Sequence, residues 1–388
     1  MDFNTDEVHD DIRSAVRALC AKFSDDYWME HDQSQEFPWE FYEAVVKGGW
    51  LGLTVPTEYG GGGQGVTEAA IVEQEIAASG AGMNGCSAVH IGVFGFEPII
   101  RHGDEQLKQR FLPRLAEGDL HVSFAVTEPD AGTDTTNLST FATKVDGGWS
   151  VSGKKVWITK AQEAERLILL ARTTPRGEVA KKTDGLTLFF APMDRNNVTV
   201  RKIPKLGRNA VDTNELFIDE LFVPDEDVVG EVGKGFRAIL AGLNAERMIS
   251  ANAALGIGRA ALRRATEYAT QREVFGRPIG RNQGIAFPLA EALMRLDAAD
   301  LTCQKAAWLL DNGHTAGREA NAAKYLAAEA SFQAADAALS AHGGYGYSKE
   351  YHIERYFREA RLMRIAPISQ EMVLNYTAEH VLGLPRSY

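Results

Sequence analysis

The 388-residue chain lacks several features that mark secreted, metal-binding or membrane proteins. Its three cysteines, Cys20, Cys86 and Cys303, lie far apart without a CxxC spacing. The sequence therefore predicts neither a disulfide framework nor a thiolate metal site. No apolar stretch of about 18 residues occurs, and the first residues show no basic and apolar leader. We expect a cytoplasmic protein that does not enter a membrane.

Positive charge is scarce as well. The chain has 41 lysines and arginines against 53 aspartates and glutamates, a formal net charge of −12. An acidic surface disfavours phosphate backbones, whose affinity comes from clustered cations, so nucleic acid is not an expected partner. The nine histidines are scattered, with no HExxH motif and no pair at i, i+4. We therefore expect no metal site.

What remains is ordinary globular composition, with 45% hydrophobic and 24% charged residues. The length exceeds one ordinary core and predicts two or three packed domains. Residues 1–120 have a helical pattern broken by turns, and 121–232 consist of short runs rich in Val, Ile, Thr and Phe. Residues 233–388 contain long, Ala-rich helical segments typical of a four-helix bundle. We expect helices at 5–23, 38–48, 66–79, 87–117, 245–272, 283–312, 316–341 and 367–382, and strands at 139–145, 149–158, 166–172, 185–192 and 214–223.

The segment Gly256-Ile257-Gly258 matches part of a dinucleotide-binding fingerprint on paper. It lies inside a helical pattern with no strand before it, so the context that gives this motif its meaning is absent. Small residues at this spacing instead predict close packing between helices.

The most specific segment is Ala125 to Asp134, at the entrance to the β region. Hydroxyl-bearing Thr127 and Thr133 flank Gly132, an arrangement suited to a flat, hydrogen-bonding heterocycle. Further on, Trp157 and Thr159 are two residues apart and share one face of a predicted strand. An aromatic wall and a donor could cover a flavin, although a core Trp and an edge Thr fit the spacing equally well.

These segments carry a resemblance to a known family. Together with 51–61, 103–118, 205–207, 223–224, 271–276 and 343–346, they resemble the acyl-CoA dehydrogenases, in the same order from about residue 40 to 375. The resemblance implies an α+β multidomain fold with an N-terminal helical domain, a central β-barrel and a C-terminal four-helix bundle. It also implies a homotetramer with one FAD per subunit, acting in fatty acid metabolism and passing electrons to an electron-transfer flavoprotein.

Cofactor contacts follow from the same resemblance, position by position. It places one set of residues along the isoalloxazine, namely Phe124, Val126, Thr127, Gly132 and Thr133, with Trp157 and Thr159 over the other edge near N5. A second set is expected to hold the pyrophosphate and adenosine across a subunit interface, and comprises Arg272, Phe275, Gln283, Gly343 and Gly344. Arg272 also has a physical warrant, because a guanidinium pairs bidentately with phosphate oxygens. Ser369 is a further expected cofactor contact.

Desaturation of an acyl thioester needs a carboxylate base for the weakly acidic α proton. Many family members carry this Glu at the position where the present chain has Pro367. Others, resembling isovaleryl-CoA and long-chain enzymes, place it on the helix that opens the C-terminal domain, where this chain has Glu246. We therefore predict Glu246 as the base; the alternative is an exposed Glu in the first turn of a helix, favoured by the macrodipole. The rival carboxylate, Glu371, is expected on a helix surface.

The acyl-CoA substrate is expected to meet Thr133, Leu243, Asn244, Arg247, Ala366 and Pro367. Proline has no N–H, yet the resemblance implies that the amide at position 367 binds the thioester carbonyl. Either the Ile368 amide takes over, or the local register shifts, or the chemistry is not ordinary desaturation. The Arg208 segment departs from the family too, because the family more often has its arginine one position later. The alternatives are an acyl-CoA or carrier-bound acyl oxidase or an eliminating enzyme of the same fold, and a non-catalytic protein that binds FAD and acyl-CoA.

Overall fold

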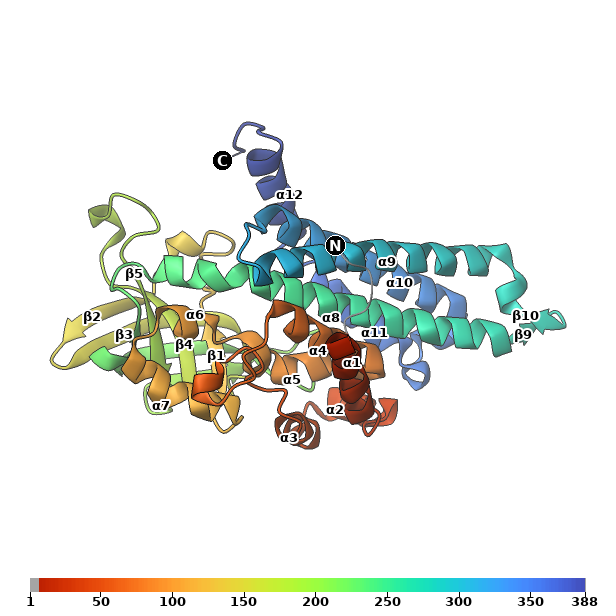
Figure 1. The fold of residues 1–388 in the computed structure, drawn as a ribbon, viewed down its shortest axis with the longest axis horizontal. Helices are drawn as coiled ribbons and strands as arrows, with labels where there is room; N and C mark the ends of the chain where they lie inside the picture. Colours follow the sequence, from red (N-terminus) through yellow and green to blue (C-terminus); the bar gives the residue numbers. More distant parts are fainter. Residues whose placement is uncertain (1–6, 388) are drawn as a thin grey trace.

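The computed structural model describes residues 7–387 as a helical block, a sheet and a second helical block (Figure 1). The expected α+β fold class is confirmed. In the first block, a buried aromatic group of Trp28, Phe41 and Tyr42 anchors the short helices. Its helices are α1 (Glu7–Cys20), α2 (Asp25–Ser34), α3 (Trp39–Lys47), α4 (Val66–Ile76), α5 (Gly82–Phe94), α6 (Glu97–His102) and α7 (Glu105–Ala116).

The sheet is mixed, with strand order β6-β7-β3-β2-β4-β5-β8, and β1 pairs parallel to β4. Strands β4 and β5 are central and buried along nearly their whole length, which explains their continuous apolar sequences. The strands are β1 (Val122–Ala125), β2 (Phe141–Val145), β3 (Gly148–Thr159), β4 (Arg166–Arg172), β5 (Leu186–Pro192), β6 (Val198–Lys202), β7 (Thr213–Pro224) and β8 (Val228–Val229).

The C-terminal block is a bundle in which α10 packs on α8, α9 and α11. Alanines line the buried face of α10, which lets the neighbouring helices approach closely. The elements are α8 (Gly235–Gln271), the hairpin β9 (Glu273–Val274) and β10 (Arg277–Pro278), α9 (Gln283–Asp311), α10 (Gly317–His342), α11 (Ile353–Met363) and α12 (Gln370–Tyr376). None of the helices within residues 7–387 is long and apolar enough to cross a bilayer.

The glycines inside α8 have the predicted packing role. A Cβ at Gly256 would lie 2.4 Å from the Gln74 carbonyl oxygen of α4, and one at Gly258 would lie 3.0 Å from the Ser331 Cα of α10. Neither helix could approach α8 this closely past a larger residue. Gly256 therefore lets α8 pack closely on the first helical block, and Gly258 does the same within the bundle.

Several elements differ from the predicted ones. Helix α8 begins at Gly235, ten residues before the predicted start at 245. Gly235 lies against β5, where a Cβ would come within 2.2 Å of the Leu188 amide nitrogen, so this position requires glycine. Glycine lowers helix propensity, so the periodic pattern is weak in this stretch. Helix α12 begins at Gln370 rather than 367, with the Ser369 hydroxyl accepting from the Met372 amide as its N-cap. Elements α2, α11, β1 and β6 were not predicted, since they are short or mainly polar.

Candidate active site

The loop that follows β1 is fixed from beneath by a buried ion pair. The Lys155 ammonium lies 2.9 Å from the Glu128 carboxylate, and both side chains are almost fully buried. Glu128 also accepts from the Ser139 amide at 2.7 Å and the Thr140 amide at 3.0 Å. Burial opposes the charge of Glu128, yet Lys155 and these donors hold its pKa at about 2. The carboxylate therefore stays ionised and anchors the loop that carries Thr127, Gly132 and Thr133.

The two predicted isoalloxazine segments lie side by side. The Val156 amide donates to the Thr127 carbonyl at 3.0 Å, and the Ser123 hydroxyl donates to the Thr159 carbonyl at 2.8 Å. Thr127 and Thr133 are exposed, Phe124 is half-buried and Val126 is buried beneath them. A Cβ at Gly132, whose φ is +54°, would meet nothing within 4 Å. The segment thus presents an open, hydroxyl-lined edge.

Trp157 departs from regular strand geometry. Its φ is +64°, and the β3–β7 register shifts between Lys155 and Ile158. A bulge of this kind re-aims a side chain. The Trp157 side chain is 59% exposed, whereas Ile158 between it and Thr159 is buried. The alternative of a core Trp at this position is therefore wrong, and the indole offers a free aromatic face.

Arg208 joins this edge to α5. Its guanidinium donates to the hydroxyls of Thr159 at 3.1 Å, Thr213 at 2.8 Å and Ser87 at 3.3 Å. The backbone of Arg208 is left-handed, with a φ of +59°. Two amides fix this turn, because Asn209 donates to Asp32 and Ala210 donates to Asn84, each at 3.0 Å. Burial lowers the pKa of Arg208 to about 10, so the side chain remains a cation at neutral pH.

Glu246 lies inside α8, eleven residues beyond its first residue. The alternative role predicted for it, an exposed first-turn Glu, is therefore wrong, because the helix starts earlier than its sequence pattern indicates. Glu246 is half-buried, and burial raises its pKa while the charges of His90 and Arg247 oppose that rise. The charges of Glu246 and Arg208 both act on the pKa of His90, and Arg208 donates a hydrogen bond to Thr159. The predicted base, Glu246, and the predicted N5 contact, Thr159, therefore belong to one region.

Most of the predicted substrate residues lie either on α8 close to Glu246 in sequence or in the segment just before α12. Leu243 and Asn244 are half-buried one turn before it, and the Arg247 guanidinium donates to the Asn244 side chain at 2.5 Å. Ala366 is half-buried and Pro367 exposed, after a cis peptide bond between the two. The buried Lys324 ammonium donates to the Ile368 carbonyl and fixes this segment. Glu371 is exposed on α12.

The second predicted cofactor set gathers at the far end of the bundle from the sheet (Figure 1). Arg272 caps α8, and its guanidinium lies 5.9 Å from the Tyr345 ring centroid. Phe275 forms the tip of the β9–β10 hairpin and is 99% exposed. Gly343 and Gly344 have open space where a Cβ would be, and Gln283 is exposed at the start of α9. Arg272 is 26 residues beyond Glu246, about 39 Å along the helix.

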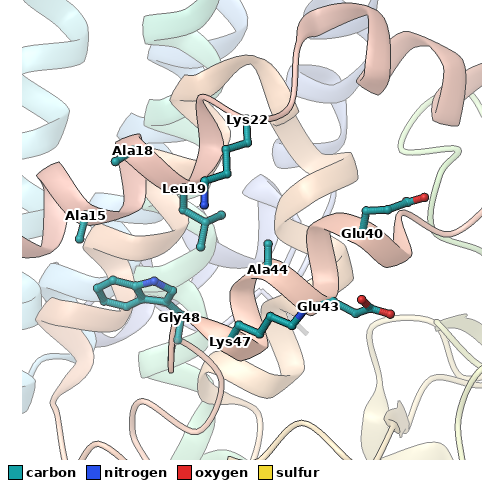
Figure 2. A pocket seen from close by; sticks show the side chains of 10 residues that line it. Ala15, Ala18, Leu19, Lys22, Glu40, Glu43, Ala44, Lys47 and Gly48 are labelled. Carbon is teal, nitrogen blue, oxygen red and sulfur yellow. The ribbon is translucent and has the colours of Figure 1, made fainter.

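A separate groove runs between α1 and α3 (Figure 2). It is lined by Leu19, Lys22, Glu40, Lys47 and Trp50. It contains none of the residues predicted for cofactor or substrate.

Three ionisable residues of this region, two buried and one half-buried, were not predicted. Buried Glu73 on α4 lies 3.6 Å from half-buried His90 on α5, whose charge acts on Glu246. Buried Glu359 on α11 accepts from the Met83 amide at 2.6 Å and fixes the start of α5. A single His or Glu within an apolar helical pattern carries no motif signal. Arg208 could have been found, because its position departs from the family pattern.

The chain belongs to the acyl-CoA dehydrogenase family. The family's N-terminal domain matches residues 6–119, its middle domain 123–221 and its C-terminal domain 233–382. The protein is accordingly an FAD-dependent oxidoreductase.

Individual relatives are similar to this chain along nearly its whole length. The acyl-CoA dehydrogenase FadE12 of Mycobacterium tuberculosis is 37% identical over all of this chain and 99% of its own. Among solved structures, the butyryl-CoA dehydrogenase of Megasphaera elsdenii has a TM-score of 0.93 at 31% identity, covering 98% of this chain and 100% of its own. The prolyl acyl carrier protein oxidase AnaB has a TM-score of 0.91 at 27% identity, with the same coverage.

The residues present fit a flavin. The exposed Trp157 indole, the open Gly132 backbone and the Thr127 and Thr159 hydroxyls offer stacking and hydrogen bonding on one edge. A flat, polar ring system needs both. Arg208 adds a half-buried cation beside Thr159.

Proposed function

We propose that this protein dehydrogenates an acyl-CoA thioester between its α and β carbons and passes the electrons to an electron-transfer flavoprotein. FAD, when bound, supplies the hydride acceptor at N5. In this proposal Glu246 takes the α proton. The observation that carries it is the position of Glu246, half-buried eleven residues into α8, close to His90, on which the charge of Arg208 also acts.

The environment of Glu246 suits a general base. Burial raises its pKa above that of an ordinary carboxylate, which makes it a stronger proton acceptor. His90 and Arg247 limit the rise and so favour the ionised form. Glu371 has no comparable surroundings, because it is exposed on α12. These contrasts favour Glu246 over Glu371.

The thioester carbonyl needs a donor where Pro367 has none. In our proposal the Ile368 amide takes over, since it has no hydrogen-bond partner among residues 7–387. Lys324 supports this assignment by holding the Ile368 carbonyl, which limits the freedom of the whole peptide segment. Arg247 and Asn244 then orient the substrate from the adjacent turn of α8.

We further propose that each FAD is shared between two copies of the chain in a homotetramer. Arg272 of the second predicted cofactor set lies about 39 Å along α8 from Glu246, whereas Thr159 of the first set belongs to the Glu246 region, so we propose that one chain does not supply both sets to the same FAD. A second copy that brings its Arg272 and Phe275 to the first copy's sheet would complete the site. The near-complete exposure of Phe275 supports this, because a large aromatic ring is seldom left without a partner.

The test of the base assignment is Glu246→Gln, with Glu371→Gln as the matched control. The holoenzyme is titrated anaerobically with a series of acyl-CoAs, and flavin bleaching is followed. We expect Glu246→Gln to lower the reduction rate by about a hundredfold to ten-thousandfold, because a general base contributes roughly 10²–10⁴-fold and no other carboxylate replaces it. Glu371→Gln should remain within about twofold of wild type. Equal reduction by wild type and Glu246→Gln would show that the base lies elsewhere.

A second candidate function is an oxidase on the same fold. Two observations favour the oxidase: the similarity to the AnaB oxidase, and the lack of a backbone N–H at Pro367. Reoxidation of the reduced holoenzyme by oxygen, at a rate matching that with an electron-transfer flavoprotein, would support the oxidase. A spectral shift on acyl-CoA addition without bleaching would indicate a protein that only binds its ligand.

A further inference from the structure

A buried carboxylate on α4 lies beside a histidine of α5, the helix that also packs against the predicted base's helix α8. The Glu73 side chain is 0% exposed, and neither of its oxygens has a hydrogen-bond partner among the described residues. The nearest charge partner is His90, whose Nδ1 lies 3.6 Å from the Glu73 carboxylate. A buried carboxylate is stable as an ion only when paired, so Glu73 has few ways to be satisfied other than through His90.

His90 lies where three helices meet. It is on α5, which packs against both α4 with Glu73 and α8 with Glu246. The His90 side chain is 22% exposed, so it is not sealed in the core with Glu73. Ser87, three residues earlier and on the same face of α5, binds Arg208. His90 therefore belongs to the wall of the candidate active site.

Four charged groups act on His90 and Glu246 from the surrounding elements. Burial alone would lower the pKa of His90, but Glu73 of α4 and Glu246 of α8 outweigh it and raise that pKa, with Arg208 opposing them. Burial raises the pKa of Glu246, and the charges of His90 and Arg247 oppose that rise. Each of the two carboxylates thus favours the protonated form of His90.

We propose that His90 is a positioning residue that keeps Glu246 ionised and ready for the α proton, while Glu73 holds the imidazolium in place. The inference rests on the proposed role of Glu246. When Glu246 accepts the proton and becomes neutral, Glu73 still balances the imidazolium. His90 can therefore retain its own proton throughout the reaction, so that only Glu246 changes charge.

The first test is the pH profile of flavin reduction in the His90→Gln holoenzyme, with His102→Gln on α6 as the matched control. Without the imidazolium, the apparent pKa of the base should rise by about one unit, since a nearby opposite charge lowers a carboxylate pKa by roughly 1–3 units. Reduction below that pKa should slow about tenfold, while the high-pH plateau stays within about twofold. A uniform loss at every pH, or an unchanged profile, would overturn the proposal.

The second test needs no turnover. Histidine-labelled holoenzyme is titrated by NMR, and the His90 signal is identified by its loss in His90→Gln. Because coupling between two sites is reciprocal, Glu246→Gln should lower the pKa of His90 by the same one unit. Glu73→Gln should lower it as well and serves as the comparison if His90→Gln does not fold. A His90 that titrates unchanged in both Gln variants would refute the assignment.

The two proposals fail separately. If Glu246→Gln still reduces its flavin with acyl-CoA, the base assignment falls and the role of His90 falls with it. If Glu246→Gln is inactive but the His90→Gln profile does not shift, only the role of His90 is wrong.

Discussion

Arg208 brings a positive charge to the place where the sheet, α5 and Thr159 meet. It is half-buried, and desolvation lowers its pKa only to about 10. Its three hydroxyl partners are neutral, and no ion pair within residues 7–387 cancels its charge. A fixed cation of this kind favours negative charge developing nearby. Since Thr159 is a proposed contact of the flavin, Arg208 should favour the gain of electrons by FAD.

Replacing Arg208 with Met tests this role. Two unit charges about 8 Å apart at an effective dielectric of about 20 interact by about 2 kcal/mol. For a two-electron couple this equals roughly 45 mV. We expect the reduction potential of bound FAD to fall by tens of millivolts in Arg208→Met, measured by equilibration against a reference dye. Arg201→Met, which replaces an exposed arginine on β6, should leave the potential unchanged. Equal potentials in wild type, Arg208→Met and Arg201→Met would show that Arg208 lies away from the flavin.

At the scale of elements, the β1 loop and β3 are joined by the Glu128–Lys155 pair. The Lys155 ammonium also donates to the carbonyls of Val126 at 3.1 Å and Leu170 at 2.7 Å. One side chain thereby connects β3, β4 and the loop that carries Thr127. The geometry of the predicted flavin edge depends on this internal support as much as on the exposed residues.

Lys155→Met should therefore destabilise the protein strongly. Removing one partner of a buried ion pair leaves an uncompensated charge and costs about 3–5 kcal/mol of unfolding free energy. Lys144→Met breaks the exposed pair with Asp225, where both side chains are 52% exposed, and should cost less than about 1 kcal/mol. Urea unfolding at neutral pH measures both. Similar losses in the two variants would mean that the buried pair contributes no more than a surface pair.

Sequence patterns predicted the parts of these elements that follow a regular period. The long helices α9 and α10 were recognised because their apolar residues repeat with the helical period, and strands β4 and β5 because their apolar residues form short continuous runs. The first ten residues of α8 were missed, since Gly235 is selected by contact with β5 rather than by helix propensity. His90 and Glu73 were missed for a related reason: their meaning arises only when α4, α5 and α8 are packed together.

At the scale of the whole molecule, α9 carries an apolar stripe that faces away from its own bundle. Phe287, Met294, Leu301 and Trp308 recur every seven residues, and each is at least half exposed. Seven residues are close to two helical turns, so the four side chains share one face. An exposed stripe of this length predicts an interface with another helix. A second copy of the chain is the occupant that would also bring a second Arg272 to the shared FAD.

The α9 stripe thus connects assembly with cofactor binding. We expect Met294→Glu combined with Leu301→Glu to dissociate the proposed tetramer, because charged side chains would be buried without partners. If each FAD is held by two copies, the dissociated protein should also lose most of its flavin. Sedimentation velocity gives the mass, and flavin absorbance per chain gives the occupancy. Phe222→Glu, an equally exposed apolar position on β7, should change neither. Dissociated chains that retain full FAD would show that one chain holds the cofactor by itself.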